Sequence, residues 1–484
     1  MKPKPFSALN HLTVPWATAP PCCSTASCSG ANRVIPVAGR RGRLQGHRQC
    51  HCDDSLTSAT LPQIAPLVRD HDALSGRIAF VASSPRTVDE HRAVVAALLA
   101  PMPAENVPVG QARGRVLAAD VVAGVALPSF DNSAMDGYAV RAADAASVPV
   151  ELPVEADIPA GRTDVPPLRP GTAHRIMTGA PVPAGADSVV PVEQTDRGLD
   201  RVRISAAPAP GAHIRRAGED VRAGDVVLLA GTVLGAPQIG VAAAVGAATV
   251  PVRRKPRVLV LSTGSELVAP GTPLRPGQIY ESNGPMLAAA VEDAGGTAEL
   301  LRFVPDDVEE FLGRLRERVG DGAVDLLLTS GGVSAGAYEV VKDAFTGRGV
   351  EFVKVAMQPG GPQGAGRVTE LGDIGVVTLP GNPVSSQVSF EVFVRPALRA
   401  ALGHPHPHRP VVTATLRERW SSPAGRRQFR RGVLDAVSGT VRELGGPASH
   451  LLGALARADC FVVVPEDVTH LPEGARVETW LLDG

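Results

Sequence analysis

The chain has few aromatic side chains and no long apolar run. Aromatic residues make up only 4% of its 484 positions, so its cores must rest on Val, Leu and Ala. No apolar stretch reaches the roughly 18 residues needed to span a bilayer. His11 and several prolines interrupt the first 21 residues, where a signal peptide would need an apolar segment. We therefore expect a cytoplasmic protein without membrane contact.

Neither sign of charge is in excess. The chain carries 48 basic and 49 acidic side chains, for a formal net charge of -1. Without a basic excess, no global electrostatic attraction favours nucleic acid, and we expect none as a partner. Net charge does not describe any one cleft, so a local anion site stays open.

Cysteine is almost absent after the N-terminal region. Five of the six cysteines precede residue 53, and their spacing fits no standard zinc pattern. A nearly cysteine-free remainder suits a reducing compartment. Residues 1–85 are rich in Ser, Pro, Gly, Arg and His and show no sustained periodicity, so we expect a disordered extension there.

The abundant residues are glycine and proline, at 51 and 44 positions. Between about residues 115 and 255 they separate short β-like runs, such as Val121–Leu127, Ser188–Val192 and Val226–Leu229. Strands this short, with frequent turns, indicate small β-rich modules. Residues 250–256, VPVRRKP, are typical of a linker.

The pattern changes after residue 256. Three nearly continuous apolar runs (257–262, 324–328 and 374–379) each end in a glycine-bearing loop, and helical periodicity follows in 285–294, 307–319 and 385–400. Continuous apolar strands are buried on both faces, and the strand, loop and helix alternation predicts a doubly wound parallel sheet. A further helix begins at a capping box formed by Thr87 and Glu90.

Four strand-like runs after residue 410 indicate a small C-terminal β-barrel-like domain, joined by a proline-interrupted spacer at 404–408. The predicted fold class is therefore multi-domain α/β plus β-rich, with two β-rich N-terminal domains. We predict the following domains: 86–129 with 215–255, an elongated linker domain; 130–214, a small β-rich domain; 256–404, the doubly wound domain; and 405–484, the C-terminal β-domain.

Small polar loops follow all three apolar runs of the predicted sheet. Ligands bind beyond the carboxyl ends of parallel strands, where small residues let backbone N–H groups approach an anion. The loops converge on one edge and so predict a phosphate or oxyanion pocket, although each alone is compatible with a tight turn. No G-x-x-x-x-G-K-[ST] motif is present, which disfavours P-loop chemistry. The candidate anion-binding residues are Ser262, Thr263, Gly264, Ser330, Gly331, Gly332, Ser334, Pro380, Gly381, Asn382, Pro383 and Ser385.

Acidic residues lie in or beside the glycine-containing loops. Glu266 and Glu339 follow the first two strand-end loops, and Asp136 and Asp220 lie in turns farther upstream. Mg²⁺ takes oxygen ligands and commonly bridges one or two carboxylates to a substrate phosphate. Each acid alone is more often a solvated loop residue or a helix cap. Their clustering in the most turn-specific segments favours a metal site.

These segments carry a family resemblance. Eight blocks occur in order, and together they resemble the molybdopterin molybdenumtransferases, the MoeA and gephyrin E-domain family. The resemblance covers about residues 87–484. The blocks are DNSAMDGYAVR (131–141), RIMTGAPVPAGADSVVPVEQT (175–195), RRAGEDV (215–221), STGSELV (262–268), IYESN (279–283), TSGGVSAGAYEVVKDAF (329–345), QPGGPQG (358–364) and LPGNPVSS (379–386).

The resemblance implies an elongated homodimer with an active site shared between the two subunits. It implies adenylylated molybdopterin and molybdate as substrates, the molybdenum cofactor and AMP as products, and Mg²⁺ held by Asp220 and Glu266. The molybdopterin adenylyltransferase and recipient molybdoenzymes are further implied partners. By motif match, the catalytic candidates are Asp136, Thr178, Asp220, Glu266, Glu339 and Lys342, and Arg215, Ser282 and Asn283 join the anion-binding candidates.

The chain departs from the family pattern at three places. Many members have Asp at the position of Glu339 and an acid at the position of Ala337. Many also have a K-P-G-K version of residues 358–361, which here read QPGG without either lysine. We expect Lys354 or Arg367 to substitute for the missing positive charge.

Two alternatives share the resemblance. A molybdopterin adenylyltransferase has a similar TSGG-bearing wound domain, but it would need neither the 87–255 segment nor the C-terminal domain. A non-catalytic scaffold on the same fold would not need the acids Asp136, Asp220 and Glu266. We therefore predict the molybdenumtransferase.

Overall fold

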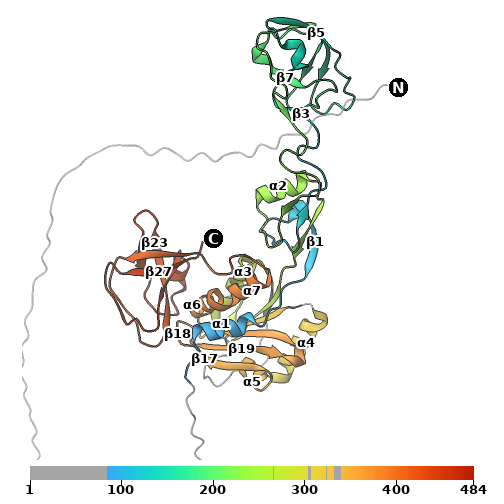
Figure 1. The fold of residues 1–484 in the computed structure, drawn as a ribbon. Helices are drawn as coiled ribbons and strands as arrows, with labels where there is room; N and C mark the ends of the chain where they lie inside the picture. The colour runs from blue at the N-terminus through green and yellow to red at the C-terminus, as the bar shows by residue number, and fades with distance from the viewer. Residues whose placement is uncertain (1–83, 265, 303–306, 323, 332–339, 484) are drawn as a thin grey trace, which may run out of the picture. The chain divides into compact units, whose positions relative to one another are not determined.

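The computed structural model describes residues 84–264, 266–302, 307–322, 324–331 and 340–483 (Figure 1). The predicted N-terminal extension and its cysteines lie outside this range, apart from residues 84 and 85. The described chain contains one wound α/β sheet, several small β-sheets and a C-terminal barrel. No described helix is long and apolar enough to cross a membrane.

The wound sheet has six strands in the order β15-β12-β16-β20-β19-β17. Three of these strands follow the apolar runs of the sequence, and they pair in parallel with one another and with β15. Only β19 runs antiparallel to both its neighbours, so the predicted parallel sheet is mixed at one edge. The strands are β12 (Arg257–Ser262), β15 (Thr297–Arg302), β16 (Leu326–Ser330), β17 (Val350–Lys354), β19 (Pro362–Val368) and β20 (Ile374–Leu379).

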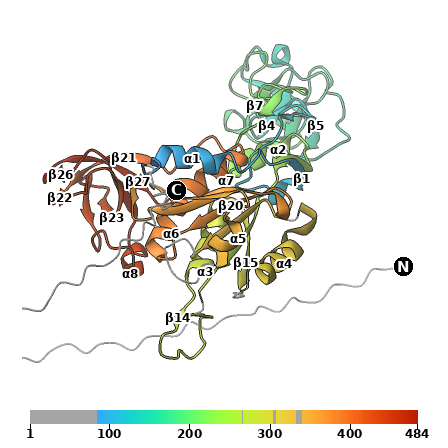
Figure 2. The same ribbon diagram turned by 90° about the horizontal axis from the view of Figure 1, so that it is seen from below.

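Helices cover both faces of this sheet, as a wound fold requires (Figures 1 and 2). On one face, α3 (Asn283–Asp293) packs with a long helical segment made of α6 (Pro383–Ser389), a π-helical turn (Phe390–Val394) and α7 (Arg395–Ala401). On the other face, Phe311 of α4 (Val308–Val319) contacts Phe345 of α5 (Val340–Phe345), with ring centroids 5.9 Å apart. The doubly wound prediction is confirmed.

The first helix, α1 (Val88–Ala96), begins at the predicted capping box. The Glu90 backbone N–H donates to the Thr87 hydroxyl, and the Glu90 carboxylate accepts from the Thr87 backbone N–H. Val88 and Val95 are buried in the same hydrophobic cluster as α3 and α7. The helix therefore packs with the wound sheet, although the sequence division grouped it with residues 86–129.

Residues 104–253 form small β-sheets, as expected. One sheet has five strands in the order β7-β4-β6-β5-β8, and three two-stranded sheets accompany it: β1 with β11, β2 with β10, and β3 with β9. The strands are β1 (Ala104–Pro108), β2 (Val121–Val122), β3 (Asn132–Ser133), β4 (Gly137–Val140), β5 (Val150–Ile158), β6 (Ala173–Ile176), β7 (Ser188–Pro191), β8 (Arg201–Ile204), β9 (Ile214–Arg215), β10 (Val226–Leu228) and β11 (Thr249–Arg253). Helix α2 (Ala236–Ala244) precedes β11.

The linker prediction for residues 250–256 was wrong over most of its length. Strand β11 pairs with β1 in five consecutive register positions, from Thr249 opposite Pro108 to Arg253 opposite Ala104. Val250 and Val252 are completely buried on one face of β11. The alternation of buried valines with proline and arginine is the period of two that a half-buried strand requires. Only the residues after Arg253 connect to the wound sheet.

The C-terminal region is a closed five-stranded barrel. Its strands follow the order β23-β24-β21-β27-β25, and β25 pairs back with β23. The four predicted strand positions are confirmed, and β24 (Thr440–Glu443) was missed because its run is short. The other strands are β21 (Val411–Leu416), β23 (Arg427–Asp435), β25 (Cys460–Val464) and β27 (Arg476–Leu481).

Candidate functional site at the strand tips

The loops after β12, β16 and β20 meet at the carboxyl edge of the wound sheet. The backbone N–H of Thr263 donates to the Ser330 carbonyl at 3.2 Å, and the backbone N–H of Gly331 donates to the Leu379 carbonyl at 3.1 Å. A Cβ on Gly331 would lie 2.8 Å from the Thr263 carbonyl oxygen. Glycine is therefore required at Gly331, whose φ is also positive at 98°. The described beginnings of the three predicted anion loops therefore lie side by side, and we call residues 262–264, 330–331 and 380–382 the strand-tip cluster.

Asn283 joins this cluster from the start of α3. Its side-chain amide donates to the Ser330 hydroxyl at 2.8 Å and to the Gly381 carbonyl at 2.7 Å. Ser330 is buried, whereas Gly381 and Asn382 are exposed. Asn382 stands at the N-cap of α6 without a side-chain capping bond. Its amide is thus available to a ligand at the tip.

Glu266 lies over the first loop of the strand-tip cluster. A Cβ on Gly264 would approach the Glu266 carboxylate oxygens to 2.6 and 2.8 Å, which places this exposed carboxylate against the glycine. The Glu266 carbonyl accepts from the Ile279 backbone N–H at 3.0 Å. The two ends of the 267–278 segment are therefore held together beside this edge. The Ser262 hydroxyl at the end of β12 is buried and has no hydrogen-bond partner among the described residues.

Asp136 and Thr178, 42 positions apart in the sequence, form a pair. Both the backbone N–H and the hydroxyl of Thr178 donate to one oxygen of the Asp136 carboxylate, at 2.7 and 2.8 Å. These two hydrogen bonds favour the ionised form and hold the pKa of Asp136 below its ordinary value of 3.8. Both side chains are exposed. The second carboxylate oxygen of Asp136 makes no described hydrogen bond and faces solvent.

Two further candidates lie near the segment that carries Asp136. Arg215 stands opposite Asn132 in the β9–β3 pair and has no ion pair among the described residues. Asp220 is exposed, and its backbone N–H donates to the Leu127 carbonyl at 3.1 Å. The neighbouring Arg216 is already committed, because its guanidinium binds the Asp131 carboxylate at 2.6 Å. Arg215, unlike Arg216, therefore remains available to an anion.

The described carboxylates do not gather into one cluster. Within the described part of the chain, no group of three or more His, Cys, Asp or Glu side chains is arranged to hold a metal ion.

Ser282 lies half-buried at the N-cap of α3 and makes no side-chain capping bond. Pro380 and Ser385 are buried, and Pro383 begins α6. Lys342 lies half-buried on α5; Gly332, Ser334, Ala337 and Glu339 lie outside the described residues.

The two proposed substitutes for the missing lysines have different positions. Arg367 stands opposite Gly375 near the start of β20, and its guanidinium donates to the Asp373 and Leu98 carbonyls, both at 2.9 Å. Its prediction as an anion contact was wrong, because it belongs to the amino edge of the sheet. Lys354 stands opposite Pro362, toward the carboxyl edge, and is exposed. Lys354 therefore stays the candidate.

Residue 358, where the family pattern has a lysine, makes a neutral contact here. The Gln358 amide oxygen accepts from the Gln428 amide at 2.9 Å. Residues 357–358 form a short strand, β18, that pairs with the start of β23. The segment is therefore fixed against the C-terminal barrel rather than presenting a charge.

Sequence reasoning missed Glu281, whose side chain is only 6% exposed. One carboxylate oxygen accepts from the Gly284 backbone N–H at 2.6 Å, and the other has no hydrogen-bond partner among the described residues. A carboxylate at this point caps the N-terminus of α3. The spacing of three residues between Glu281 and Gly284, just ahead of an apolar helical run, was the available signal.

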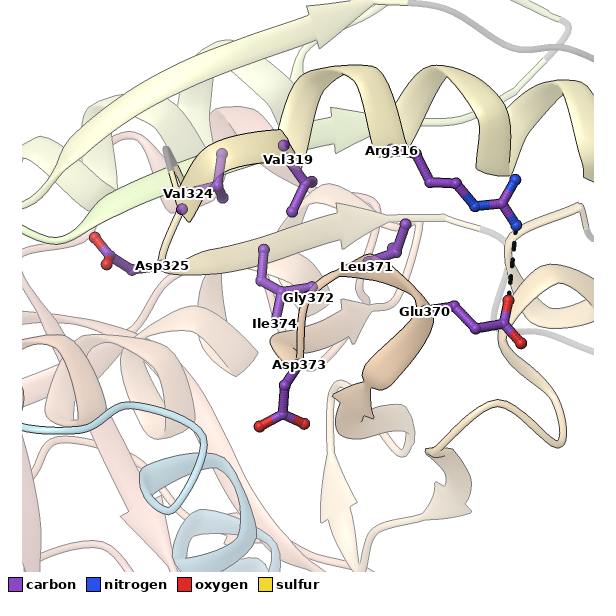
Figure 3. A pocket seen from close by; sticks show the side chains of 11 residues that line it. Arg316, Val319, Val324, Asp325, Glu370, Leu371, Gly372, Asp373 and Ile374 are labelled. Atoms are coloured by element: carbon purple, nitrogen blue, oxygen red, sulfur yellow. Dashed lines mark ion pairs between the residues drawn. The ribbon is translucent and has the colours of Figure 1, made fainter.

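A separate pocket of about 300 Å³ lies at the opposite edge of the sheet (Figure 3). It is lined by Asp325 before β16 and Ile374 at the start of β20, and an Arg316–Glu370 ion pair at 3.7 Å borders it. Ligands of open α/β sheets bind at the carboxyl ends of the strands. This pocket is therefore not part of the candidate site.

The wound sheet, the small β-sheets and the C-terminal barrel define a multi-domain α/β protein with β-rich flanking domains. Three family models match it in order along the chain. Residues 86–246 match the MoeA N-terminal region (domain I and II), residues 259–400 match a probable molybdopterin binding domain, and residues 413–482 match the MoeA C-terminal region (domain IV). The chain belongs to the MoeA family of molybdopterin molybdenumtransferases.

Named relatives and a solved structure agree with this assignment. Molybdopterin molybdenumtransferase 2 of Mycobacterium tuberculosis is 56% identical over 406 residues, covering 82% of this chain and 99% of the relative. Molybdopterin molybdenumtransferase 1 of the same organism is 40% identical over 427 residues, with the same two coverages. A crystal structure of a MoeA protein from Pyrococcus horikoshii superimposes with a TM-score of 0.71 at 32% identity, over 83% of this chain and all of that one.

Proposed function

We propose that this protein inserts molybdate into adenylylated molybdopterin, releasing AMP and completing the molybdenum cofactor. The observation that carries the proposal is the strand-tip cluster, which lies within residues matched by the molybdopterin-binding model. Small residues at this edge let a phosphate-bearing ligand approach the backbone closely. The flanking MoeA regions favour this reaction over that of a lone adenylyltransferase.

The strand tips bind the phosphate end of the substrate, and exposed polar groups complete its recognition. The Asn382 amide and the Thr263 hydroxyl provide hydrogen bonds at the edge, and Lys354 supplies positive charge toward it. Fixed groups of this kind orient the reacting phosphoanhydride before reaction, so that less reorganisation is needed in the transition state.

Asp136 acts as an ionised acceptor in this proposal. Because Thr178 holds its pKa below 3.8, Asp136 stays a carboxylate at neutral pH. Its free oxygen accepts a hydrogen bond from an attacking water and holds the water oxygen in line with the scissile bond. A carboxylate with so low a pKa is a weak base, so its contribution is orientation more than proton removal.

Glu266, the exposed carboxylate beside the strand tips, suits Mg²⁺ of the kind that is bound by one or two carboxylates and by substrate phosphate oxygens. Glu266, exposed over Gly264 beside the phosphate loops, would hold it, and Asp220 would supply a second carboxylate. When bound, the ion would neutralise charge on the phosphoanhydride. Arg215 would supply positive charge in the same role from the protein.

We propose that the protein is a homodimer. Asp136, Thr178 and Asp220 lie in the β-rich segments, and the strand tips belong to the wound sheet. We infer that the two halves of the site come from different subunits. Val122 and Val226, 54% and 49% exposed on the β2–β10 sheet, offer an apolar surface for a second copy of the chain. We further propose that the protein acts in the cytoplasm, where the adenylyltransferase and recipient molybdoenzymes would be its partners.

An anaerobic assay with adenylylated molybdopterin, molybdate and Mg²⁺ tests the proposal. We expect AMP release together with a cofactor that reconstitutes a cofactor-free molybdoenzyme, and both signals should require molybdate. Pterin adenylylation from ATP, without molybdate insertion, would instead identify an adenylyltransferase. Substrate binding without AMP release would identify a scaffold.

A further inference from the structure

Asp136 carries a negative charge at the point where the proposed substrate brings further negative charge. Its carboxylate stays ionised, because the two hydrogen bonds from Thr178 lower its pKa. An ionised carboxylate repels the phosphate oxygens of a substrate, and the repulsion is strongest where water is excluded. A cation within reach of Asp136 would offset this repulsion.

Arg175 lies on the same face of the five-stranded sheet as Asp136. Arg175 on β6 stands opposite Tyr138 on β4, and residues paired in this way point to one face. Asp136 precedes Tyr138 by two positions, so it belongs to that face as well. Its carbonyl accepts from the Val192 backbone N–H at 3.0 Å, which continues the pairing of β4 with β7. Diagonal neighbours of this kind are about 7–8 Å apart, within reach of a long side chain.

The charge of Arg175 acts on Asp136. The Thr178 hydrogen bonds have the larger effect on the pKa of Asp136, and the positive charge of Arg175 lowers that pKa further. A charge that is felt at the carboxylate is also felt by an anion bound against it. Arg175 is therefore placed to act on the same substrate group as Asp136.

The ion pair that Arg175 makes within the protein is weak. Its guanidinium lies 3.6 Å from the carboxylate of Asp157, which stands opposite Arg175 on β5. The two side chains are 39% and 57% exposed. Exposed ion pairs contribute little stability, because solvent screens the charges and two long side chains lose rotamer freedom. A phosphate can bind a guanidinium through two parallel N–H···O bonds, so it can displace Asp157.

We propose that Arg175 is a further catalytic residue, which binds the non-bridging oxygens of the phosphoryl group attacked by the water on Asp136. This rests on the proposed function, because it assumes that the phosphoanhydride reacts beside Asp136. The water oxygen bonds to phosphorus, the bond from this phosphorus to the bridging oxygen breaks, and the water proton passes to solvent. Negative charge spreads over the phosphoryl oxygens in the transition state, where a fixed guanidinium stabilises it most.

Anaerobic single-turnover assays of the full chain with adenylylated molybdopterin, molybdate and Mg²⁺ test this role. We expect Arg175→Gln to slow AMP release at saturating substrate at least about 10²-fold, as for the loss of one transition-state donor. Affinity for adenylylated molybdopterin should stay within about threefold of wild type, because an interaction made in the transition state changes the rate more than the binding. Arg175→Lys keeps the charge without the two parallel donors and should fall between Arg175→Gln and wild type.

Asp157→Asn distinguishes substrate binding from a structural ion pair. It frees the Arg175 guanidinium, so we expect AMP release at the wild-type rate or up to about threefold faster, with little change in stability. If the pair were only structural, Arg175→Gln and Asp157→Asn would slow AMP release alike. Arg201→Gln is the matched control, because Arg201 forms an exposed ion pair with Glu151 in the same sheet. It should leave AMP release within about twofold of wild type.

A wild-type rate in Arg175→Gln, or equal losses in Arg175→Gln and Asp157→Asn, would overturn the catalytic role. If thermal unfolding shows that Arg175→Gln fails to fold, Arg175→Lys takes its place in both comparisons. A wild-type protein that releases no AMP would instead overturn the proposed function, and this role with it.

Discussion

The strand-tip cluster and the Asp136–Thr178 pair are built in opposite ways. At the tips, three loops contact one another through backbone atoms, Ser330 is buried, and Asn283 uses both amide hydrogens internally. Asp136 and Thr178 bind only each other, and both are exposed. The tips form a preassembled ligand platform, whereas Asp136 presents one ionised oxygen outward. This difference suggests that the tips determine binding and that Asp136 determines turnover.

The largest effect should come from Gly331→Ala, which breaks the platform. The new Cβ would lie 2.8 Å from the Thr263 carbonyl oxygen at a φ of 98°, and neither backbone atom can move without opening the tip. Left-handed backbone strain and overpacking each cost on the order of 1–3 kcal/mol. We expect urea unfolding to show a loss of about 2 kcal/mol, and AMP release to become undetectable.

Gly381→Ala is the matched control for stability at the same edge. Its Cβ would meet only Gly331 Cα at 3.5 Å, which is an ordinary contact. We expect a stability change within about 0.5 kcal/mol, as is usual for an unstrained surface position. If Gly331→Ala and Gly381→Ala lower the free energy of unfolding by similar amounts, the close contact at Gly331 is not the cause of the loss.

Asp136→Asn should separate turnover from stability. The amide keeps the shape but removes the charge, so we expect AMP release to slow by about 10²-fold or more, as for other positioned acid–base groups. The free energy of unfolding should stay within about 0.5 kcal/mol, because the side chain is exposed. Asp200→Asn, at another exposed position of the β-rich segment, should change neither quantity. A wild-type rate for Asp136→Asn would remove this residue from the mechanism.

The smallest effect should be a pKa change at Asp136 in Thr178→Val. Valine removes the hydroxyl donor and leaves the backbone N–H, so the pKa of Asp136 should rise toward 3.8 without reaching it. In the wild type, the stabilisation that goes with the lowered pKa is present above about pH 4 and is lost as pH falls through the folded-state value. Carboxyl carbon-13 titration measures both pKa values. An unchanged pKa in Thr178→Val would show that the hydroxyl does not bind the carboxylate.

The sequence predicted the parts of the fold that local patterns determine. The apolar runs 257–262 and 374–379 became β12 and β20 without a shift, because a strand buried on both faces needs an uninterrupted apolar run. The capping box at Thr87 also formed as predicted, since its partners are three residues apart.

Other parts depend on tertiary contacts that the sequence does not display. Strand β19, which contains Gly364 and Gly366, was not predicted from the sequence. Both glycines are required. A Cβ on Gly364 would lie 2.2 Å from the Thr378 hydroxyl oxygen, and a Cβ on Gly366 would lie 1.9 Å from the Gly349 carbonyl oxygen. Strand β11 was read as a linker because its partner β1 is about 145 residues earlier.

For the candidate site, the chain pattern predicted the convergence of the three loops, since parallel strands end at one edge. Family resemblance gave Asp136 and Thr178 only as separate candidates, and their pairing was not predicted, because nothing local links positions so far apart. The sequence assigned Asn283 to the substrate, whereas both of its N–H groups bind the protein. Which polar groups are already satisfied is decided by tertiary packing, and this limits the prediction of ligand contacts from sequence.

One measurement tests the division between binding and turnover most directly: anaerobic titration of adenylylated molybdopterin into wild type, Gly331→Ala and Asp136→Asn. The account predicts that Gly331→Ala loses at least about tenfold in affinity, whereas Asp136→Asn binds within about twofold of wild type and fails to release AMP. Normal binding by a folded Gly331→Ala, or lost binding by Asp136→Asn, would contradict it.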